Sequence, residues 1–267
     1  MLTRIPPTFQ RLIDEDADHF GEPGLVVLKA PEPPNELCRV KLENWLARRG
    51  ASYQAKRHSE YLYFESDDPE KGPRILISAF MPTPDNMDQY LRQSANKYRP
   101  RLKGNRARKA GYTTRRISPA EEAAGIWKII HSVSQRQGRP VSPMFNDRSP
   151  EHDFAEYRDY GDALFNDICC GVFAPDGSLA AYLLGKRVGD HVQYDEIMGH
   201  SDHIANDVMY LLHFAFLEMC AASPHPPQCL NYGSWYSGSN PFSPEGGLNR
   251  WKRKVKFKPA YLILASS

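Results

Sequence analysis

Three short apolar segments separated by two turn sequences constrain the fold of this chain more than any other feature. The segments are residues 167–174, 178–188 and 191–199, and the turns are residues 175–177 and 189–190. This spacing predicts three consecutive strands joined by tight turns. Apolar side chains then recur every three or four positions over residues 204–219, which predicts a long helix directly after the third strand.

Further elements are expected on both sides of this unit. The predicted strands are residues 24–29, 60–66, 74–80, 111–117, 228–232 and 257–265, and the predicted helices are residues 36–49, 84–99 with a continuation to 111, 118–137, 150–166 and 244–254. Residues 60–66 and 74–80 surround the turn-forming sequence DDPEKGP, so they are expected to pair as a hairpin. Ser118, Pro119 and Glu121 have the spacing of a capping box, which predicts a helix start at Ser118.

The composition is that of a folded globule of one large or two modest domains. The chain has 267 residues, of which 41% are hydrophobic and 11% aromatic. It has no apolar run long enough to span a membrane, and its N-terminus carries acids and prolines where a signal peptide would be apolar. Five cysteines without CxxC spacing favour reduced thiols and a cytoplasmic protein, and the adjacent Cys169 and Cys170 are expected on opposite faces of a strand.

Positive charge is concentrated in two windows that contain no acid. The windows are residues 92–116, with ten Lys and Arg residues, and residues 250–258, with six. The rest of the chain holds 18 basic and 32 acidic residues, so the net charge of +2 hides a strong polarity. Concentrated positive charge favours a polyanionic partner, and the alternative is a pair of solvated basic helix faces.

The order of elements over residues 111–265 resembles the Gcn5-related N-acetyltransferase (GNAT) fold. The basic helix that runs into AGYTTRRIS, the helix that ends in SQRQGRP, and GGLNRWKRKVKFKP near the C-terminus are similar to Fem-type aminoacyl-tRNA-dependent transferases. The resemblance implies an α+β fold with a mixed, mostly antiparallel sheet flanked by helices. It implies a catalytic domain at 111–267, a basic helical connector at 84–110, and a small α/β extension at 1–83, which is either a truncated GNAT-like half or an unrelated cap.

The implied activity is transfer of an aminoacyl group from a charged tRNA, or another acyl carrier, to an amine of a small molecule or peptide. Residues expected to bind the donor or a polyanion are Lys97, Arg99, Arg101, Lys103, Arg106, Arg108, Arg250, Trp251, Arg253 and Lys254. Tyr98, Tyr112 and Trp251 are placed to stack on exposed bases. No tightly bound cofactor is expected, because the charged tRNA, acyl-coenzyme A or acyl carrier protein would be a co-substrate.

The sequence departs from acetyl-coenzyme-A-dependent relatives at the start of the central helix. Those relatives place a glycine-rich loop there, whose backbone N–H groups hold pyrophosphate. Here residues 199–207 read GHSDHIAND, and Asp202 and Asp207 are expected to repel phosphate, with Asp202 also a candidate helix cap. The alternatives that remain are an acyl-coenzyme-A or acyl-carrier-protein N-acyltransferase, and a non-catalytic nucleic-acid or anion-binding protein on the same fold.

Four residues are candidates for catalysis. The resemblance places Lys252 near the acyl-bearing end of the donor, where an ammonium could stabilise an oxyanion, although Lys252 could instead be one more solvated lysine. Tyr232 is a candidate general acid or a packing residue. Asp195 and Glu196 border the expected cleft but should point to opposite faces, so at most one would contact substrate. His200 and His203 lack partners for a recognisable zinc set, and no metal is expected.

Overall fold

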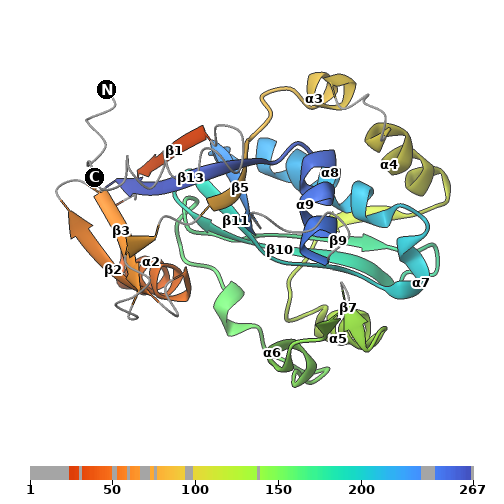
Figure 1. The fold of residues 1–267 in the computed structure, drawn as a ribbon. Coiled ribbons are helices and arrows are strands. Elements are labelled where there is room, and N and C mark those ends of the chain that lie inside the picture. The colour runs from red at the N-terminus through yellow and green to blue at the C-terminus, as the bar shows by residue number, and fades with distance from the viewer. Residues whose placement is uncertain are drawn as a thin grey trace.

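One mixed sheet organises the part of the chain that the structure describes. The computed structural model describes residues 24–29, 32–49, 53–58, 61–66, 73–74, 77–93, 99–136, 139–235 and 244–265. Within these ranges eleven strands form the sheet, and helices cover both of its faces (Figure 1). Two strand pairs are parallel: β1 (Gly24–Lys29) with β13 (Lys258–Ala265), and β11 (His191–Gly199) with β12 (Cys229–Ser234). The α+β class with a mostly antiparallel sheet is confirmed.

The predicted three-strand unit is confirmed. β9 (Ile168–Phe173), β10 (Leu179–Val188) and β11 pair in chain order, and β6 (Thr113–Arg116) extends them at the edge. The turn glycines Gly177 and Gly189 have φ of +83° and +62°, which glycine adopts without steric cost. Cys169 and Cys170 pack into different hydrophobic clusters on the two faces, as the alternation predicts.

The other half of the sheet brings the two ends of the chain together. β5 (Ile77–Pro82) pairs with both β12 and β13. β3 (Tyr61–Ser66) pairs with β13, with β4 (Pro73–Arg74) and with β2 (Tyr53–His58). The strand β2 was not predicted. The hairpin expected from residues 60–66 and 74–80 forms only at β4, because β13 lies between β3 and β5. The extension expected at residues 1–83 thus contributes strands to the same sheet as the C-terminal region (Figure 1).

Helix α8 (Val208–Ala221) is the central helix, packed between the sheet on one side and α4 (Pro100–Lys109) on the other. It is buried around most of its circumference, which explains why apolar residues occupy all its sides. Gly104 permits the close packing of α4, since a Cβ there would lie 2.9 Å from the Phe214 ring. The opposite face of the sheet is covered by α2 (Glu36–Arg49), α5 (Ala123–His131) and α6 (Pro143–Asn146).

Two helix predictions on that opposite face are wrong. Helix α5 begins at Ala123 with no side-chain cap at Glu122, so the capping box predicted at Ser118 does not form and residues 119–122 are turns. Residues 150–166 hold only a short 3₁₀ turn, η1 (Ala155–Tyr157). The physical reason is that aspartate side chains in this segment accept hydrogen bonds from backbone N–H groups two residues onward, which stabilises turns at the expense of a helix. The pairs are Asp153 with Ala155, Asp159 with Gly161 and Asp162 with Leu164.

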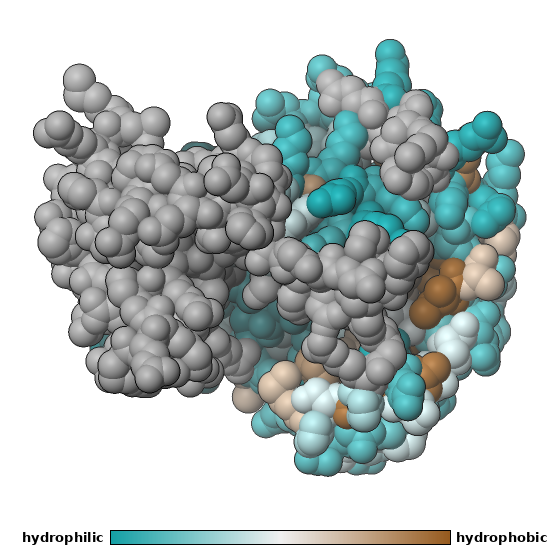
Figure 2. Space-filling view, viewed as in Figure 1, coloured by the Kyte–Doolittle hydropathy of each residue, from teal (hydrophilic) through white to brown (hydrophobic). Residues whose placement is uncertain are grey.

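The basic helices form as predicted, except for the residues outside the described ranges. α3 (Met87–Gln93), α4 and α9 (Pro244–Lys254) correspond to the predicted helices, and Pro100 occupies the first turn of α4. Figure 2 shows hydrophilic side chains over α4 at the upper right of the molecule. None of the described helices is long and apolar enough to cross a membrane.

Candidate functional site

The parallel strands β11 and β12 pair over only three residues and then separate. Residues 191–193 of β11 are in register with residues 229–231 of β12, and β11 continues to Gly199 without a β12 partner. β12 is irregular at the same point, because its register with β5 shifts between Asn231 and Ser234 and Gly233 has φ of +61°. Two parallel strands that diverge leave an opening between them that side chains must line.

A cavity of about 970 Å³ fills this opening. Its wall is largely apolar. It is built mainly from the end of β11, the start of α8, helix α9 and the segment around α6, with further residues from α4, α7 (Ser201–Ile204), β7 (Gln135–Arg136) and β12. The residues that the structure brings there include Ile197, Met198, Met209, Tyr210, Tyr232, Leu248, Trp251 and Phe145. A cavity of this size with a mainly apolar wall and several polar side chains is typical of a substrate site.

Lys252 and Tyr232 meet beside this cavity. Tyr232 lines it, and the Lys252 Nζ lies 5.0 Å from the centre of the Tyr232 ring. Lys252 is 1% exposed, and burial lowers the pKa of its ammonium to about 8. Burial also raises the pKa of the Tyr232 phenol, so the hydroxyl stays protonated at neutral pH. The structure therefore places a buried cation and a phenol together, from α9 and β12.

The two basic windows converge at the rim of the same cavity. Lys103 of α4 and Arg250 of α9 both line it. Between them lies Tyr210, whose ring is 4.8 Å from the Trp251 ring and carries the Lys103 Nζ over its face at 4.9 Å. Residues about 150 positions apart in the sequence thus share one surface patch, which the sequence could not place.

Acidic residues from α8 neutralise part of this basic surface. Asp207, at the N-cap of α8, forms ion pairs with Arg106 and with Lys103, whose Nζ is 3.6 Å from Oδ1, and Arg108 pairs with Glu218 at 3.1 Å. The expected repulsion of phosphate by Asp207 is therefore reduced by two cations. These ion pairs were not predicted, because both windows are free of acid in sequence and the acidic partners belong to another helix.

The other predicted donor-binding residues differ in exposure. Arg99 and Arg101 are exposed on α4, and Arg253 is exposed with its guanidinium 5.3 Å from the Trp235 ring. Lys254 is half-buried on α9. Lys97 and Tyr98 lie outside the described residues.

The expectation that Tyr112 stacks on bases is wrong, because its ring is buried. Its hydroxyl accepts a hydrogen bond from Asn206 and contacts His203 Nδ1 at 2.9 Å. The neighbouring His200 caps α7 (Ser201–Ile204) by accepting from the Asp202 backbone N–H, so the cap predicted at Asp202 is formed by His200 instead. In the described ranges, no three His, Cys, Asp or Glu side chains gather in a way that could hold a metal ion.

Asp195 and Glu196 lie on the same face of the sheet, so the prediction of opposite faces is wrong. The β10–β11 register shifts at Leu184/Gly185, which leaves Asp195 as the extra residue of a bulge. Glu196 is held by Arg148 at 2.8 and 2.5 Å and accepts from the Tyr182 hydroxyl at 3.3 Å. Asp195 pairs with Lys186 at 3.0 Å. Both acids bind cations on the face opposite α8, and neither lines the cavity beside Tyr232.

Arg136 is a residue of this site that the sequence did not single out. Its guanidinium donates to the backbone oxygen of Gly199 at 3.1 Å and to that of Ile129. It thereby ties the end of β11 to the end of α5 at the cavity wall. An arginine near the end of the helix predicted at residues 118–137 carries no signal of this role, because both acceptors are backbone oxygens.

Comparison with known proteins gives a result at the level of structure alone. No protein-family model and no curated protein matches the sequence. Among solved structures, FemX aligns with a TM-score of 0.53 and 12% identity over 82% of this chain and 66% of the FemX chain. L-PGS from Bacillus licheniformis aligns with a TM-score of 0.46 and 13% identity, over 88% of this chain and 92% of that chain. A tandem GNAT protein from the clavulanic acid biosynthesis pathway has a TM-score of 0.41 and 15% identity, over 90% of this chain and 61% of that chain.

Of these three alignments, that with FemX exceeds a TM-score of 0.5, and this chain spans 66% of the length of FemX. The match agrees with the order of strands and helices expected from the sequence. The chain therefore shares the fold of FemX.

Proposed function

We propose that this protein is an N-acyltransferase that moves an aminoacyl group from a charged tRNA, or another acyl carrier, to an amine of a small molecule or peptide. The observation that carries the proposal is the cavity at the separation of β11 and β12, with Lys252 and Tyr232 beside it. The sequence resemblance to Fem-type transferases supports the same activity.

The proposed chemistry needs a positive group and a proton donor at the acyl carbon. The amine nitrogen attacks the carbonyl carbon, a C–N bond forms, and the ester bond to the carrier breaks. Because the pKa of Lys252 is about 8, its ammonium is mostly protonated at pH 7 and can stabilise the oxyanion. The Tyr232 hydroxyl, whose pKa burial raises, donates its proton to the departing oxygen and regains one from the amine through water.

The shared rim of α4 and α9 supports a polyanionic donor. Lys103 and Arg250 line the cavity, and the exposed Arg99 and Arg101 extend positive charge outward along α4. In this arrangement the carrier phosphates follow the rim while its acyl end enters the cavity. Trp251 is half-buried beside Arg250 and offers a ring edge to a base.

An acyl-coenzyme-A donor is the second candidate, and one observation favours it. Asp207 is paired with Arg106 and Lys103, so it repels a pyrophosphate less than its sequence position suggests. Calorimetry with acetyl- and longer acyl-coenzyme A separates the two donors. Low-micromolar binding of any of them would favour coenzyme A over a charged tRNA.

Transfer of label from bulk aminoacyl-tRNA to a mixture of amines and peptides tests the activity. Lys252→Met should lower the rate by roughly 10²–10³-fold, the effect seen when one oxyanion donor is lost, and should change donor binding much less. Tyr232→Phe should also lower the rate. Lys254→Met is the matched control, because Lys254 has the same charge on the same helix.

Equally mild effects of the Lys252 and Lys254 substitutions would contradict the catalytic role of Lys252. Absence of transfer to any amine, combined with retained tRNA binding, would favour a non-catalytic nucleic-acid-binding protein. Mass spectrometry of nucleic acids and thioester carriers that co-purify at low salt would identify the donor directly.

A further inference from the structure

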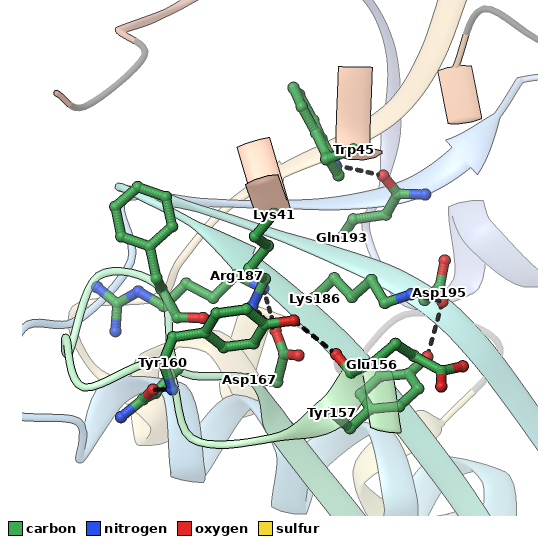
Figure 3. A network of polar contacts seen from close by, with 12 residues as sticks. Lys41, Trp45, Glu156, Tyr157, Tyr160, Asp167, Lys186, Arg187, Gln193 and Asp195 are labelled. Atoms are coloured by element: carbon green, nitrogen blue, oxygen red, sulfur yellow. Dashed lines mark hydrogen bonds and ion pairs between the residues drawn. The ribbon is translucent and has the colours of Figure 1, made fainter. Parts of the chain in front are cut away.

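A second cavity lies on the sheet face opposite α8, between α2 and the strands β10 and β11. Its volume is about 200 Å³, which at about 30 Å³ per water corresponds to roughly seven waters. Figure 3 shows the side chains that surround it, which come from α2, from the segment around η1 and from the two strands. The lining includes Lys41, Trp45, Glu156, Tyr160, Lys186 and Asp195.

Both lysines of the wall are already balanced by their own acids. The Lys41 ammonium pairs with Asp167, donates to the Phe165 backbone oxygen and lies 4.0 Å from the Tyr160 ring centre. Lys186 Nζ lies 3.0 Å from the Asp195 carboxylate. Breaking a buried ion pair of this kind is costly, because it leaves one charge uncompensated. An anionic ligand would have to displace one of these acids.

Glu156 is the charge on the wall that remains unmatched. Its backbone oxygen accepts a hydrogen bond from the Tyr160 hydroxyl at 2.8 Å, but its half-buried carboxylate has no hydrogen bond or ion pair within the described ranges. When Asp167, the partner of Lys41, is counted with the lining residues, three acids face two lysines, which is an excess of one negative charge. The rings of Trp45 and Tyr160, both buried, form apolar walls of the same cavity.

The neighbouring strand β12 carries a buried amide on the same face of the sheet as this cavity. Asn231 of β12 is in register with Gln193 of β11, and Gln193 lines the cavity and accepts a hydrogen bond from the Trp45 indole at 2.8 Å. Residues in register on parallel strands point to the same face. The Asn231 amide is fully buried, and neither its oxygen nor its nitrogen has a hydrogen-bond partner among the residues that the structure describes. Buried amides rarely remain unsatisfied unless a ligand or water completes them.

We propose that this cavity binds a small organic cation, a primary ammonium on a short aliphatic chain, with Glu156 as its counter-ion. The ammonium pairs with the Glu156 carboxylate, and the aliphatic part packs against Trp45 and Tyr160. The site is separate from the cavity beside Lys252 and does not depend on acyl transfer.

Calorimetry with three probes of the same carbon skeleton tests the charge preference: n-butylammonium, 1-butanol and butyrate. We expect n-butylammonium to bind at least tenfold more tightly than either other probe. Glu156→Gln should weaken its binding at least tenfold, which is about 1.4 kcal/mol. Glu151→Gln is the matched control and should leave binding unchanged, because Glu151 is an exposed acid of the same segment that does not line the cavity.

A measurement on the unmodified protein keeps the test independent of how the variants fold. The indole N–H resonance of Trp45 should shift when n-butylammonium is added and stay in place with butyrate. Equal binding of 1-butanol, tighter binding of butyrate, or no effect of Glu156→Gln would overturn the proposal. The absence of any Trp45 shift with n-butylammonium would overturn it as well.

Discussion

Replacing Lys252 with Met should stabilise the folded protein near neutral pH while it lowers the rate of the proposed transfer. Lys252 is 1% exposed, and burial lowers the pKa of its ammonium from 10.5 to about 8. That difference corresponds to roughly 3 kcal/mol, at about 1.4 kcal/mol for each tenfold change in the dissociation constant. Since Met has a similar length and no charge, Lys252→Met should raise the free energy of unfolding at pH 7 by up to about this amount.

The pH dependence distinguishes this cause from a change in packing. Between pH 8 and 10.5 the unfolded protein binds more protons at Lys252 than the folded protein does, so the contribution of this residue makes stability rise with pH in that window. The advantage of the Met variant should therefore shrink above pH 8, by roughly 2 kcal/mol at pH 9.5. Urea unfolding of both proteins at pH 7, 8.5 and 9.5 measures it. A variant that is less stable at pH 7, or a difference that does not change with pH, would refute the reasoning.

Three further outcomes follow from buried groups elsewhere in the fold. Arg148→Ala should destabilise the protein by about 3–5 kcal/mol in urea unfolding, because it leaves the buried Glu196 carboxylate without its cation; a loss below 1 kcal/mol would contradict a buried pair. Gly185→Ala should lower the free energy of unfolding by about 1–3 kcal/mol, because a Cβ there would lie 2.6 Å from the Phe216 ring. Thermal unfolding measures this loss, and an unchanged unfolding temperature would mean that the ring moves aside freely. Burial lowers the pKa of His213 from 6.5 to about 3, so between these pH values the unfolded state binds a proton that the folded state does not. The free energy of unfolding should therefore fall as the pH drops from 6.5 towards 3. His213→Gln should lessen this dependence, and an unchanged pH profile would argue against a buried neutral imidazole.

The polyanion surface has its own test in the salt dependence of tRNA binding. Affinity for bulk tRNA should fall steeply with salt, because each phosphate contact releases a counterion. Arg101→Gln should reduce the slope by about one phosphate contact, and Arg39→Gln, an exposed arginine of α2 on the opposite face, should leave it unchanged. A slope near zero in the unmodified protein would remove the tRNA donor from the proposal.

Local sequence patterns determined the parts of this fold that depend on neighbours in the chain. The strands β9, β10 and β11 and the helix α9 follow from apolar runs, turn glycines and helical spacing within a few residues. The same patterns failed for residues 150–166, where aspartate side chains bind the local backbone and compete with a helix. Helix propensity averaged over a stretch of residues does not account for such individual hydrogen bonds.

The tertiary structure alone decided which charges meet. Asp207 and Glu218 are far in sequence from the basic residues that they pair with, and only the packing of α4 on α8 brings them together. Strand alternation predicted that Asp195 and Glu196 point to opposite faces, but a bulge in β11 places both on one face. Lys252 and Tyr232 were each candidates from the sequence, but their contact depends on where α9 crosses β12. Ion pairing and burial depend on distances in space, and a pattern of neighbouring residues in the sequence does not predict those distances.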